Sequence, residues 1–200
     1  MAGGVASAPL CGLVLAGGRS RRMGRDKATL DRRGVSLLAH AYDCVAAVTD
    51  SAWVSVRADQ VDDPERRRFP QIVDRHADIG PVAGILAALE AVPEADWLVV
   101  ACDLPNLDRE TLAGLLAGAP TGAPLVAYRS ASDGLPEPLC ALYRAGSAAL
   151  IAPHVAAGVV CPRKILLRND AVLLDLPDRD ALVNVNTPED LRASIAGSRP

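Results

Sequence analysis

Residues 11–27 read CGLVLAGGRSRRMGRDK and establish how the start of the chain is organised. The apolar run Cys11–Ala16 has the length of a strand, and the segment Gly17–Arg25 that follows it holds three glycines and four arginines. The apolar spacing between Leu37 and Val48 then suits a helix. The order of strand, loop and helix predicts a βα unit whose loop combines bare backbone with dense positive charge.

The same alternation of strand and helix continues along the chain. Asp96–Cys102 is the clearest central strand, because Trp97–Ala101 is apolar on both faces, as in a parallel strand covered by helices on both sides. This alternation predicts the α/β class: one doubly wound, mostly parallel sheet with right-handed connections and helices on both faces. The other predicted strands are 53–56, 71–73, 124–128, 138–143 and 171–176, and the other helices are 81–92, 107–116, 145–157 and 187–195.

Length and composition indicate a single folded domain. A chain of 200 residues, half of them apolar, is long enough to bury a sizeable core. We expect a loose head over residues 1–9, the domain over residues 10–196 and a short tail over residues 197–200. Only 3% of the residues are aromatic and the net charge is −3, which argues against a nucleic-acid partner.

Cysteine usage and hydropathy predict a cytoplasmic protein without a membrane partner. The five cysteines are far apart and form no C-x-x-C pair, which indicates reduced thiols. The sequence has no apolar run of about 18 residues or more that could span a bilayer. Residues 1–9 also lack the basic flank and the long apolar stretch of a secretory signal.

The glycine-rich loop is a candidate triphosphate site. Backbone N–H groups approach phosphate oxygens closely where no Cβ intrudes, as at Gly17 and Gly18, and Arg and Lys add charge-assisted hydrogen bonds. The loop is not of the Walker type, because Arg25 follows Gly24, and the chain contains no G-x-G-x-x-G fingerprint. The alternative is an ordinary glycine turn with a solvated basic surface. The position directly after a buried strand favours a ligand site.

A lone carboxylate, Asp103, follows the most buried predicted strand. Mg²⁺ in proteins commonly uses one or two carboxylates together with phosphate oxygens of the substrate, so Asp103 is a candidate metal ligand. Alternatively, Asp103 caps the helix after Pro105 or pairs with an arginine. We expect the adjacent Cys102 to be a buried, unreactive thiol.

An ordered series of motifs runs along the chain, from Leu15-Ala16-Gly17-Gly18 through Cys102-Asp103-Leu104-Pro105 to Asn184-Val185-Asn186-Thr187-Pro188-Glu189. This series resembles that of the molybdenum cofactor guanylyltransferases. This family consists of nucleotidyltransferases with a single Rossmann-like domain, and the resemblance extends from about Gly12 to Leu191. The motifs between Leu15 and Lys27 alone indicate only the wider nucleotidyltransferase group. The motifs that begin at Glu137 and at Asn184 narrow the resemblance to the guanylyltransferases. The motifs are Leu15-Ala16-Gly17-Gly18, Arg22-Met23-Gly24, Asp26-Lys27, Asp74, Gly80-Pro81 with Gly84, Cys102-Asp103-Leu104-Pro105, Glu137-Pro138-Leu139 and Asn184-Val185-Asn186-Thr187-Pro188-Glu189.

The resemblance implies a reaction in which GTP and the molybdopterin form of the molybdenum cofactor give the guanine dinucleotide cofactor and pyrophosphate, with Mg²⁺ as the cofactor. The attacking phosphate of the pterin is already anionic near neutral pH, so the reaction needs no general base. The three histidines, which show no metal-ligand or triad spacing, agree with this. Positive charge must instead bring an anionic nucleophile to an anionic α-phosphate, which is the role of Mg²⁺ and Lys27.

The resemblance also implies roles for individual residues. The nucleotide receives backbone contacts from Leu15, Ala16 and Gly17, a phosphate contact from Lys27 and a guanosine-side contact from Asp74, while Asp103 binds the metal. We expect Gly18, Arg19 and Arg22 to assist at the phosphates. Asn184 and Asn186, at the end of the last strand, are expected near the metal and the pterin phosphate; the alternative for this pair is a turn that caps the helix starting at Thr187.

Three functions are open at this point. One is the guanylyltransferase, and the second is a sibling nucleotidyltransferase that transfers a cytidylyl group to the same pterin or acts on a sugar phosphate. Some relatives carry an amide side chain where this chain has Ser55, with Arg57 nearby. The motifs therefore indicate the class of reaction more strongly than the preference for one base. The third is a carrier that binds molybdopterin and passes it to a client molybdoenzyme.

We expect Asp62–Arg68 to be an exposed polar connection and Cys161–Lys164 to be a loop.

Overall fold

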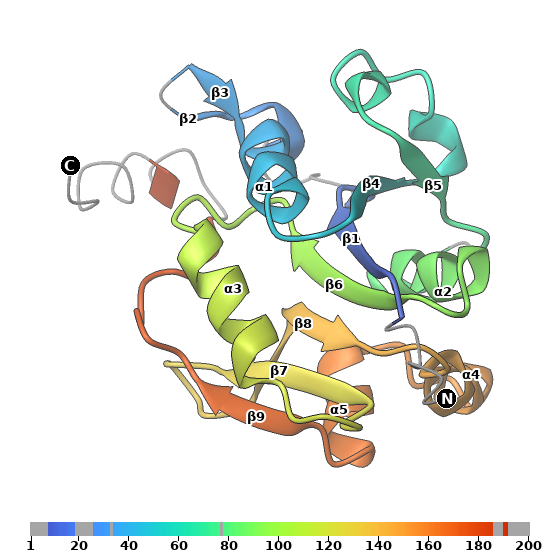
Figure 1. Cartoon of the computed structure of the whole chain (residues 1–200). Coiled ribbons are helices and arrows are strands. Elements are labelled where there is room, and N and C mark those ends of the chain that lie inside the picture. The colour runs from blue at the N-terminus through green and yellow to red at the C-terminus, as the bar shows by residue number, and fades with distance from the viewer. Residues whose placement is uncertain (1–7, 19–25, 33, 77, 186–189, 192–200) are drawn as a thin grey trace, which may run out of the picture.

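The computed structural model describes residues 8–18, 26–32, 34–76, 78–185 and 190–191, and its main feature is a seven-stranded sheet (Figure 1). The strands of this sheet are β1 (Leu10–Leu15), β4 (Ser51–Val56), β5 (Gln71–Val73), β6 (Asp96–Ala101), β7 (Leu125–Arg129), β8 (Pro136–Tyr143) and β9 (Val172–Asp175). Their order is β5-β4-β1-β6-β8-β7-β9. Neighbours are parallel except that β8 runs antiparallel to both β6 and β7. The predicted mostly parallel sheet is confirmed.

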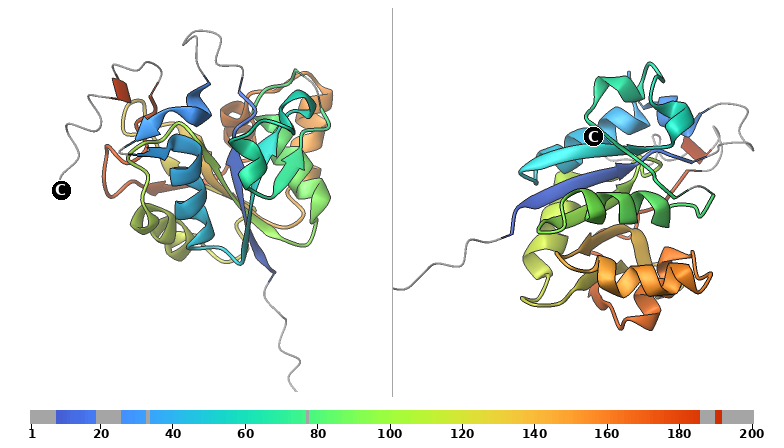
Figure 2. Two further views of the ribbon diagram at one scale, coloured as in Figure 1. Left: turned by 90° about the horizontal axis from the view of Figure 1, so that it is seen from above. Right: turned by 90° about the vertical axis from the view of Figure 1, so that its right-hand side faces the viewer.

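Helices cover both faces of this sheet, as predicted (Figures 1 and 2). The α-helices are α1 (Leu37–Ala46), α2 (Val82–Ala91), α3 (Arg109–Gly118), α4 (Ala148–Ala156) and α5 (Pro162–Arg168). Helices α1 and α3 pack on one face, and α2, α4 and α5 pack on the other. Shorter elements are the 3-10 helices η1 (Lys27–Thr29), η2 (Ala58–Gln60) and η3 (Arg66–Arg68) and the small antiparallel pair β2 (Asp31–Arg32) and β3 (Val35–Ser36).

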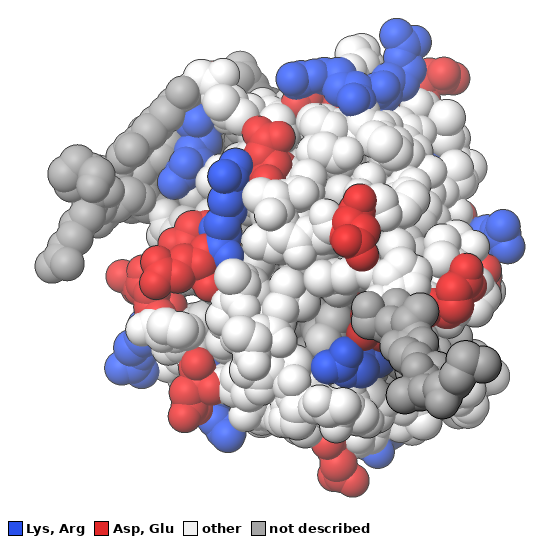
Figure 3. Space-filling view, in the orientation of Figure 1, with Lys and Arg blue, Asp and Glu red and all other residues white. Residues whose placement is uncertain are grey.

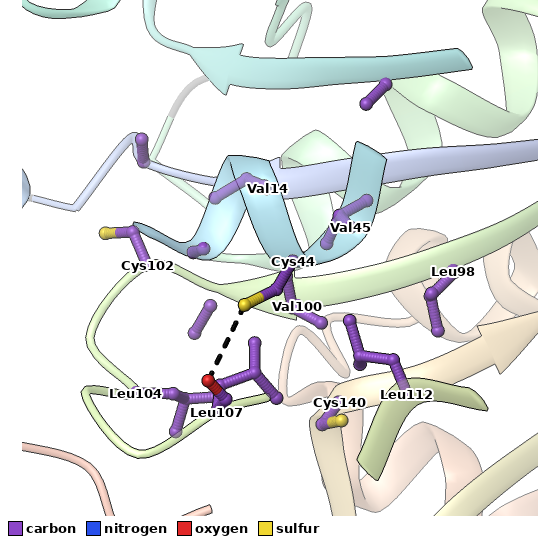
Figure 4. Packing of buried hydrophobic residues seen from close by; sticks show 14 of the residues in the cluster. Val14, Cys44, Val45, Leu98, Val100, Cys102, Leu104, Leu107, Leu112 and Cys140 are labelled. Carbon is purple, nitrogen blue, oxygen red and sulfur yellow. Dashed lines mark hydrogen bonds between the residues drawn. The ribbon is translucent and has the colours of Figure 1, made fainter. Parts of the chain in front are cut away.

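The central strand β6 belongs to two hydrophobic cores, one on each face of the sheet. Leu98 and Val100 point into the core beneath α1 and α3, and Trp97 and Val99 point into the core beneath α2, α4 and α5. All four side chains are fully buried. Figure 4 shows the first of these cores from close by. Successive side chains of a strand point to opposite faces, so a strand covered on both sides must be apolar throughout.

Side-chain caps fix where two helices of the first face begin. The Ser36 hydroxyl accepts a hydrogen bond from the Ala39 amide at the start of α1, and the Asp108 carboxylate accepts one from the Thr111 amide at the start of α3. Such caps satisfy backbone donors that a helix end would otherwise leave unpaired. The second cap places the start of α3 at Arg109, two residues after the predicted start of this helix at residue 107.

Two sequence predictions about connecting segments are wrong. Cys161–Lys164 is not a loop: helix α5 begins at Pro162, a position that tolerates proline because its missing N–H needs no partner there. Asp62–Arg68 is not wholly exposed, because Arg66 is buried. Of the predicted helix 187–195, only residues 190 and 191 are described, and both are helical.

The charge of the surface and the length of the helices bear on contact with nucleic acids and membranes. On the face seen in Figure 3, basic and acidic side chains are interspersed, with one group of basic side chains at the top of the view. Among the described residues, no helix is both long enough and apolar enough to cross a bilayer.

Candidate active site

The topology brings the glycine-rich loop and Asp103 to the same edge of the sheet. Strands β1 and β6 are parallel neighbours, with Leu15 paired to Ala101 at their carboxyl ends. Gly17 and Gly18 follow the first strand, and Asp103 follows the second. The chain runs outward from β1 through β4 to β5 and then returns to β6 on the other side of β1, so β1 marks the point where strand order reverses. Ligands of open parallel sheets bind at this point.

Lys27 and Asp103 form an ion pair at this edge. The Nζ atom of Lys27 lies 3.0 Å from Oδ2 of Asp103, and both side chains are about one-fifth exposed. Lys27 is the first residue of η1, which begins where Asp26 Oδ1 accepts a hydrogen bond from the Ala28 amide at 3.0 Å. Since Asp108 caps α3 and Lys27 pairs with Asp103, neither alternative role predicted for Asp103 applies in the described part of the chain.

Asp74 lies beside the glycine-rich loop, at the end of β5. The Ser55 hydroxyl donates a hydrogen bond to Asp74 Oδ1 at 2.6 Å. Burial raises the pKa of the Asp74 carboxyl, although the hydrogen bond from Ser55 and the charge of Arg57 act to lower it. A Cβ on Gly17 would lie only 3.0 Å from Asp74 Oδ2, so glycine allows the loop to approach this carboxylate.

Two clefts meet at Asp103. The first has a volume of about 680 Å³, within the range of small-molecule sites. Its lining includes seven of the predicted site residues: Leu15, Ala16, Gly17, Gly18, Lys27, Asp74 and Asp103. The second cleft has about 400 Å³, and the two share Ala101, Asp103 and Leu139. Asp103 therefore lies where the two clefts adjoin.

The predicted position of Asn184 needs a correction. Asn184 does not end a strand, because β9 stops at Asp175 and the chain continues through an irregular segment. It is exposed and lines the second cleft, and the neighbouring Val185 amide donates to the Asp103 carbonyl at 3.0 Å. This hydrogen bond brings the segment close to Asp103, although Val185 and Asp103 are 82 positions apart in sequence. Arg19, Arg22 and Asn186 lie outside the described residues.

Sequence reasoning missed two arginines that bind the backbone of the glycine-rich loop. Arg57 donates a hydrogen bond to the Gly17 carbonyl. Arg66 donates two to the Ala16 carbonyl, from Nε at 3.2 Å and from Nη2 at 2.8 Å. The partners are 40 and 50 residues apart in sequence, so no local pattern could have revealed these contacts.

The donor set suits a metal ion that is held mainly by the substrate. Among the described residues, no three His, Cys, Asp or Glu side chains cluster as a complete metal site would require. A single carboxylate on the wall of a cleft, as at Asp103, matches the way Mg²⁺ is bound by one or two carboxylates, water and phosphate oxygens. Asp103 therefore fits the predicted role of metal ligand.

A doubly wound sheet with a glycine-rich loop, a lysine and an aspartate at its switch point defines a nucleotide-binding α/β domain. The chain belongs to the family of MobA-like NTP transferase domains, whose model matches residues 12–172. The resemblance found in the sequence is thereby confirmed at the level of the family.

Named relatives are similar over most of the chain. A molybdenum cofactor guanylyltransferase from Pseudomonas aeruginosa is 37% identical over 189 residues, which cover 88% of this chain and 90% of the relative. A molybdenum cofactor biosynthesis bifunctional protein from Synechocystis is 36% identical over 93% of this chain, and this chain spans 54% of that longer relative. The crystal structure of molybdopterin-guanine dinucleotide biosynthesis protein A from Archaeoglobus fulgidus superposes with a TM-score of 0.77 at 25% identity, covering 93% of this chain and 97% of that one.

Proposed function

We propose that this chain transfers GMP from GTP to the terminal phosphate of molybdopterin, giving the guanine dinucleotide form of the molybdenum cofactor and pyrophosphate. The observation that carries this proposal is the Lys27–Asp103 pair at the meeting point of two clefts in a MobA-like NTP transferase domain. Transfer between two substrates needs two adjoining sites and a shared centre of charge. The names of the relatives support molybdopterin and GTP as the substrates.

GTP occupies the first cleft in this proposal. Backbone N–H groups at Gly17 and Gly18 and the Lys27 ammonium bind the phosphates, and Arg19 and Arg22 assist there as further cations. Asp74, held by Ser55, accepts a hydrogen bond from the guanosine. Leu15 and Ala16 line this cleft at the end of β1, where the Ala16 amide and carbonyl are bonded to Ser55 and to Arg66.

Molybdopterin occupies the second cleft. Arg163 and Arg179 line this cleft and provide positive charge for an anionic phosphate. Arg163 is oriented by Asp133 at 2.7 Å and by Glu137 at 3.4 Å. Asn184, on the wall of the same cleft, donates from its amide without adding charge, and Asn186 acts with it.

The chemistry needs charge more than it needs a base. The pterin phosphate attacks the α-phosphorus of GTP as an anion, the new phosphoanhydride bond forms and pyrophosphate leaves. Lys27 stabilises the charge that builds up on the phosphates. Mg²⁺, held by Asp103 and by phosphate oxygens, supplies further positive charge when bound.

The base preference is tested by comparing GTP, CTP, ATP and UTP as donors to molybdopterin, with pyrophosphate release as the readout. We expect GTP to be strongly preferred, because a pocket that hydrogen-bonds one base leaves polar groups unpaired when another binds. Turnover of CTP in preference to GTP would contradict guanylyl transfer and favour the cytidylyl sibling. Removal of divalent ions with a chelator should stop turnover, and added Mg²⁺ should restore it.

The same proposal places the enzyme in the cytoplasm, where its product is passed to a client molybdoenzyme. A carrier that only binds the cofactor would release no pyrophosphate from GTP, so pyrophosphate release by the wild-type chain separates the two functions. Asp103→Ala should abolish pyrophosphate release while the circular dichroism spectrum stays that of the wild type. Normal pyrophosphate release by this variant would contradict the role of Asp103.

A further inference from the structure

Arg66 is a buried cation whose contacts have no place in the chemistry above. It lies in η3, between β4 and β5, and only 1% of its side chain is exposed. A buried guanidinium is costly unless charge and hydrogen bonds compensate it. Nη1 of Arg66 lies 2.7 Å from Asp26 Oδ2 and 3.1 Å from Asp63 Oδ1, while Nε and Nη2 donate to the Ala16 carbonyl.

The contacts of Arg66 with Ala16 and Asp26 lie at the two ends of the glycine-rich loop. Ala16 comes directly before Gly17, and Asp26 comes directly before Lys27. One guanidinium therefore holds together the residue that enters the loop and the residue that leaves it. Contacts from one rigid group to both flanking residues fix the backbone before Gly17 relative to the backbone before Lys27, which preorganises the two for a shared ligand.

The bond to Ala16 also fixes the direction of a backbone donor. In a planar trans peptide, the C=O and the following N–H point in opposite directions. With the Ala16 carbonyl turned toward Arg66, the Gly17 N–H points away from Arg66. Arg57 holds the Gly17 carbonyl in the same manner and so sets the direction of the Gly18 N–H. Gly17 and Gly18 line the first cleft, whereas Arg66 does not.

The ion pair with Asp26 extends this control to Lys27. Asp26 uses Oδ2 for Arg66 and Oδ1 for the Ala28 amide, which fixes the first turn of η1. Lys27 begins that turn, and its ammonium reaches Asp103. A single buried side chain thus supports both the backbone donors and the lysine that we assign to the triphosphate.

We propose that Arg66 is a positioning residue for the triphosphate of the bound nucleotide, acting from behind the glycine-rich loop through Ala16 and Asp26. The proposal rests on the proposed function, since it requires a triphosphate in the first cleft. It assigns no contact between Arg66 and the nucleotide itself.

The test compares GTP and guanosine binding by the wild-type chain with binding by Arg66→Met and Arg66→Lys. Met has a similar length but no hydrogen-bond donor, and Lys keeps the charge but lacks the planar fork that places two donors on one carbonyl. Arg67→Met is the matched control, because Arg67 is exposed in the same 3-10 helix. Dissociation constants are measured by calorimetry with Mg²⁺ present, and thermal melting checks that each variant is folded.

We expect Arg66→Met to bind GTP about tenfold or more weakly, the order expected for losing one charge-assisted hydrogen bond, while guanosine binding stays unchanged. Arg66→Lys should recover part of the loss, and Arg67→Met should match the wild type.

Equal weakening for GTP and guanosine would indicate a general structural role and overturn the proposal. Unchanged GTP binding by Arg66→Met, or by Arg66→Lys if the first variant does not fold, would also overturn it. A wild-type chain that binds guanosine but gains nothing from the triphosphate would overturn the proposed function together with this inference.

Discussion

Lys27 and Asp103 form an ion pair in the structure, whereas the proposed function gives them different partners. Lys27 is proposed to bind a phosphate of the nucleotide, and Asp103 is proposed to bind the metal ion. Their 3.0 Å contact involves side chains that are about one-fifth exposed, so both can turn toward a ligand in the cleft without a buried charge being left unpaired. The pair places a cation and an anion side by side where the phosphates and the metal ion are proposed to bind. This arrangement is ready for a ligand of mixed charge.

Removing the cation of this pair should slow transfer more than it weakens binding of the pterin. We expect Lys27→Ala to lower the rate of pyrophosphate release by about a hundredfold, the effect of losing one preorganised charge at the reacting phosphate. Arg67→Ala, which changes an exposed cation of η3, is the control and should be unaffected. A Lys27→Ala variant with the wild-type rate would show that the lysine does not act on the phosphates.

The buried carboxylate of Asp74 should lower the stability of the free protein. Burial raises the pKa of Asp74 in the folded chain, so the folded chain binds more protons than the unfolded chain between the two pKa values. Stability from this group therefore falls as pH rises through that window and stays low above it. Asp74→Asn removes the charge and keeps an oxygen that can accept the Ser55 hydrogen bond.

We expect Asp74→Asn to raise the melting temperature at pH 8 by about 2–4 °C, which corresponds to about 1 kcal/mol in a domain of this size, and to raise it less at pH 4. The same variant should bind GTP more weakly, because it loses the acceptor for the guanosine side. A lower melting temperature at pH 8 would indicate that the hydrogen bond and the Arg57 charge outweigh the effect of burial.

The residues of the site divide into those that sequence could reveal and those that it could not. Gly17 and Asp103 were predictable because they follow buried strands closely, and Lys27 because it belongs to the Asp26-Lys27 motif at the end of the glycine-rich loop. Arg66 was not, since its partners Ala16 and Asp26 are distant in sequence and its neighbours Arg67 and Arg68 are exposed. Only the fold shows which of three consecutive arginines points inward.

Helix α2 must pack closely on the sheet to keep Asp74 in place. A Cβ on Gly84 would lie 2.2 Å from the Ser55 hydroxyl oxygen and 2.7 Å from a methyl carbon of Leu15. Both neighbours are on strands of the site, β4 and β1, and Ser55 is almost fully buried and bonded to Asp74. There is thus little room for the helix to adapt.

Gly84→Ala should destabilise the chain by about 1–3 kcal/mol through overpacking, measured by urea unfolding. Gly118→Ala is the matched control in another helix: there the new methyl group meets only the flexible end of Leu174, and alanine favours helix. We expect that variant to be near neutral in stability. Equal unfolding free energies for Gly84→Ala and the wild type would contradict the close packing of α2.

Elements with a clear pattern of apolar residues were predictable from the sequence. Elements stabilised mainly by tertiary packing were not. The strand Gln71–Val73 was predicted with its observed bounds, and β6 was predicted to within one residue because its both-face apolar pattern is unambiguous. Helix α5 has only seven residues, begins with proline and buries Ile165 and Leu166 beyond it. A helix this short gains its stability from packing, so its sequence alone gives a weak signal.

At the scale of the whole molecule, the two-core architecture encloses most of the thiols. Four of the five cysteines are buried, and Cys161 at the start of α5 is exposed. Burial raises the pKa of Cys102 and of Cys140 to about 12, which keeps these thiols protonated and unreactive. The expectation of an inert thiol at Cys102, beside the proposed metal ligand Asp103, agrees with this environment.

A thiol reagent such as Ellman's reagent should therefore modify one cysteine rapidly at pH 8 in the native chain and all five after denaturation. Cys161→Ser should remove the rapid phase, because it removes the exposed thiol. Rapid modification of several thiols in the native Cys161→Ser variant would contradict the enclosed cores on the two faces of the sheet.

A crystal structure of the chain with GTP and Mg²⁺ tests most directly whether the glycine-rich loop, Lys27 and Asp103 act on one triphosphate. We expect the phosphates to lie in the first cleft, against the backbone of Gly17 and Gly18, with the Lys27 ammonium on a phosphate oxygen and the Asp103 carboxylate on the metal ion. A nucleotide bound elsewhere, or one whose phosphates and metal touch neither Lys27 nor Asp103, would contradict this site.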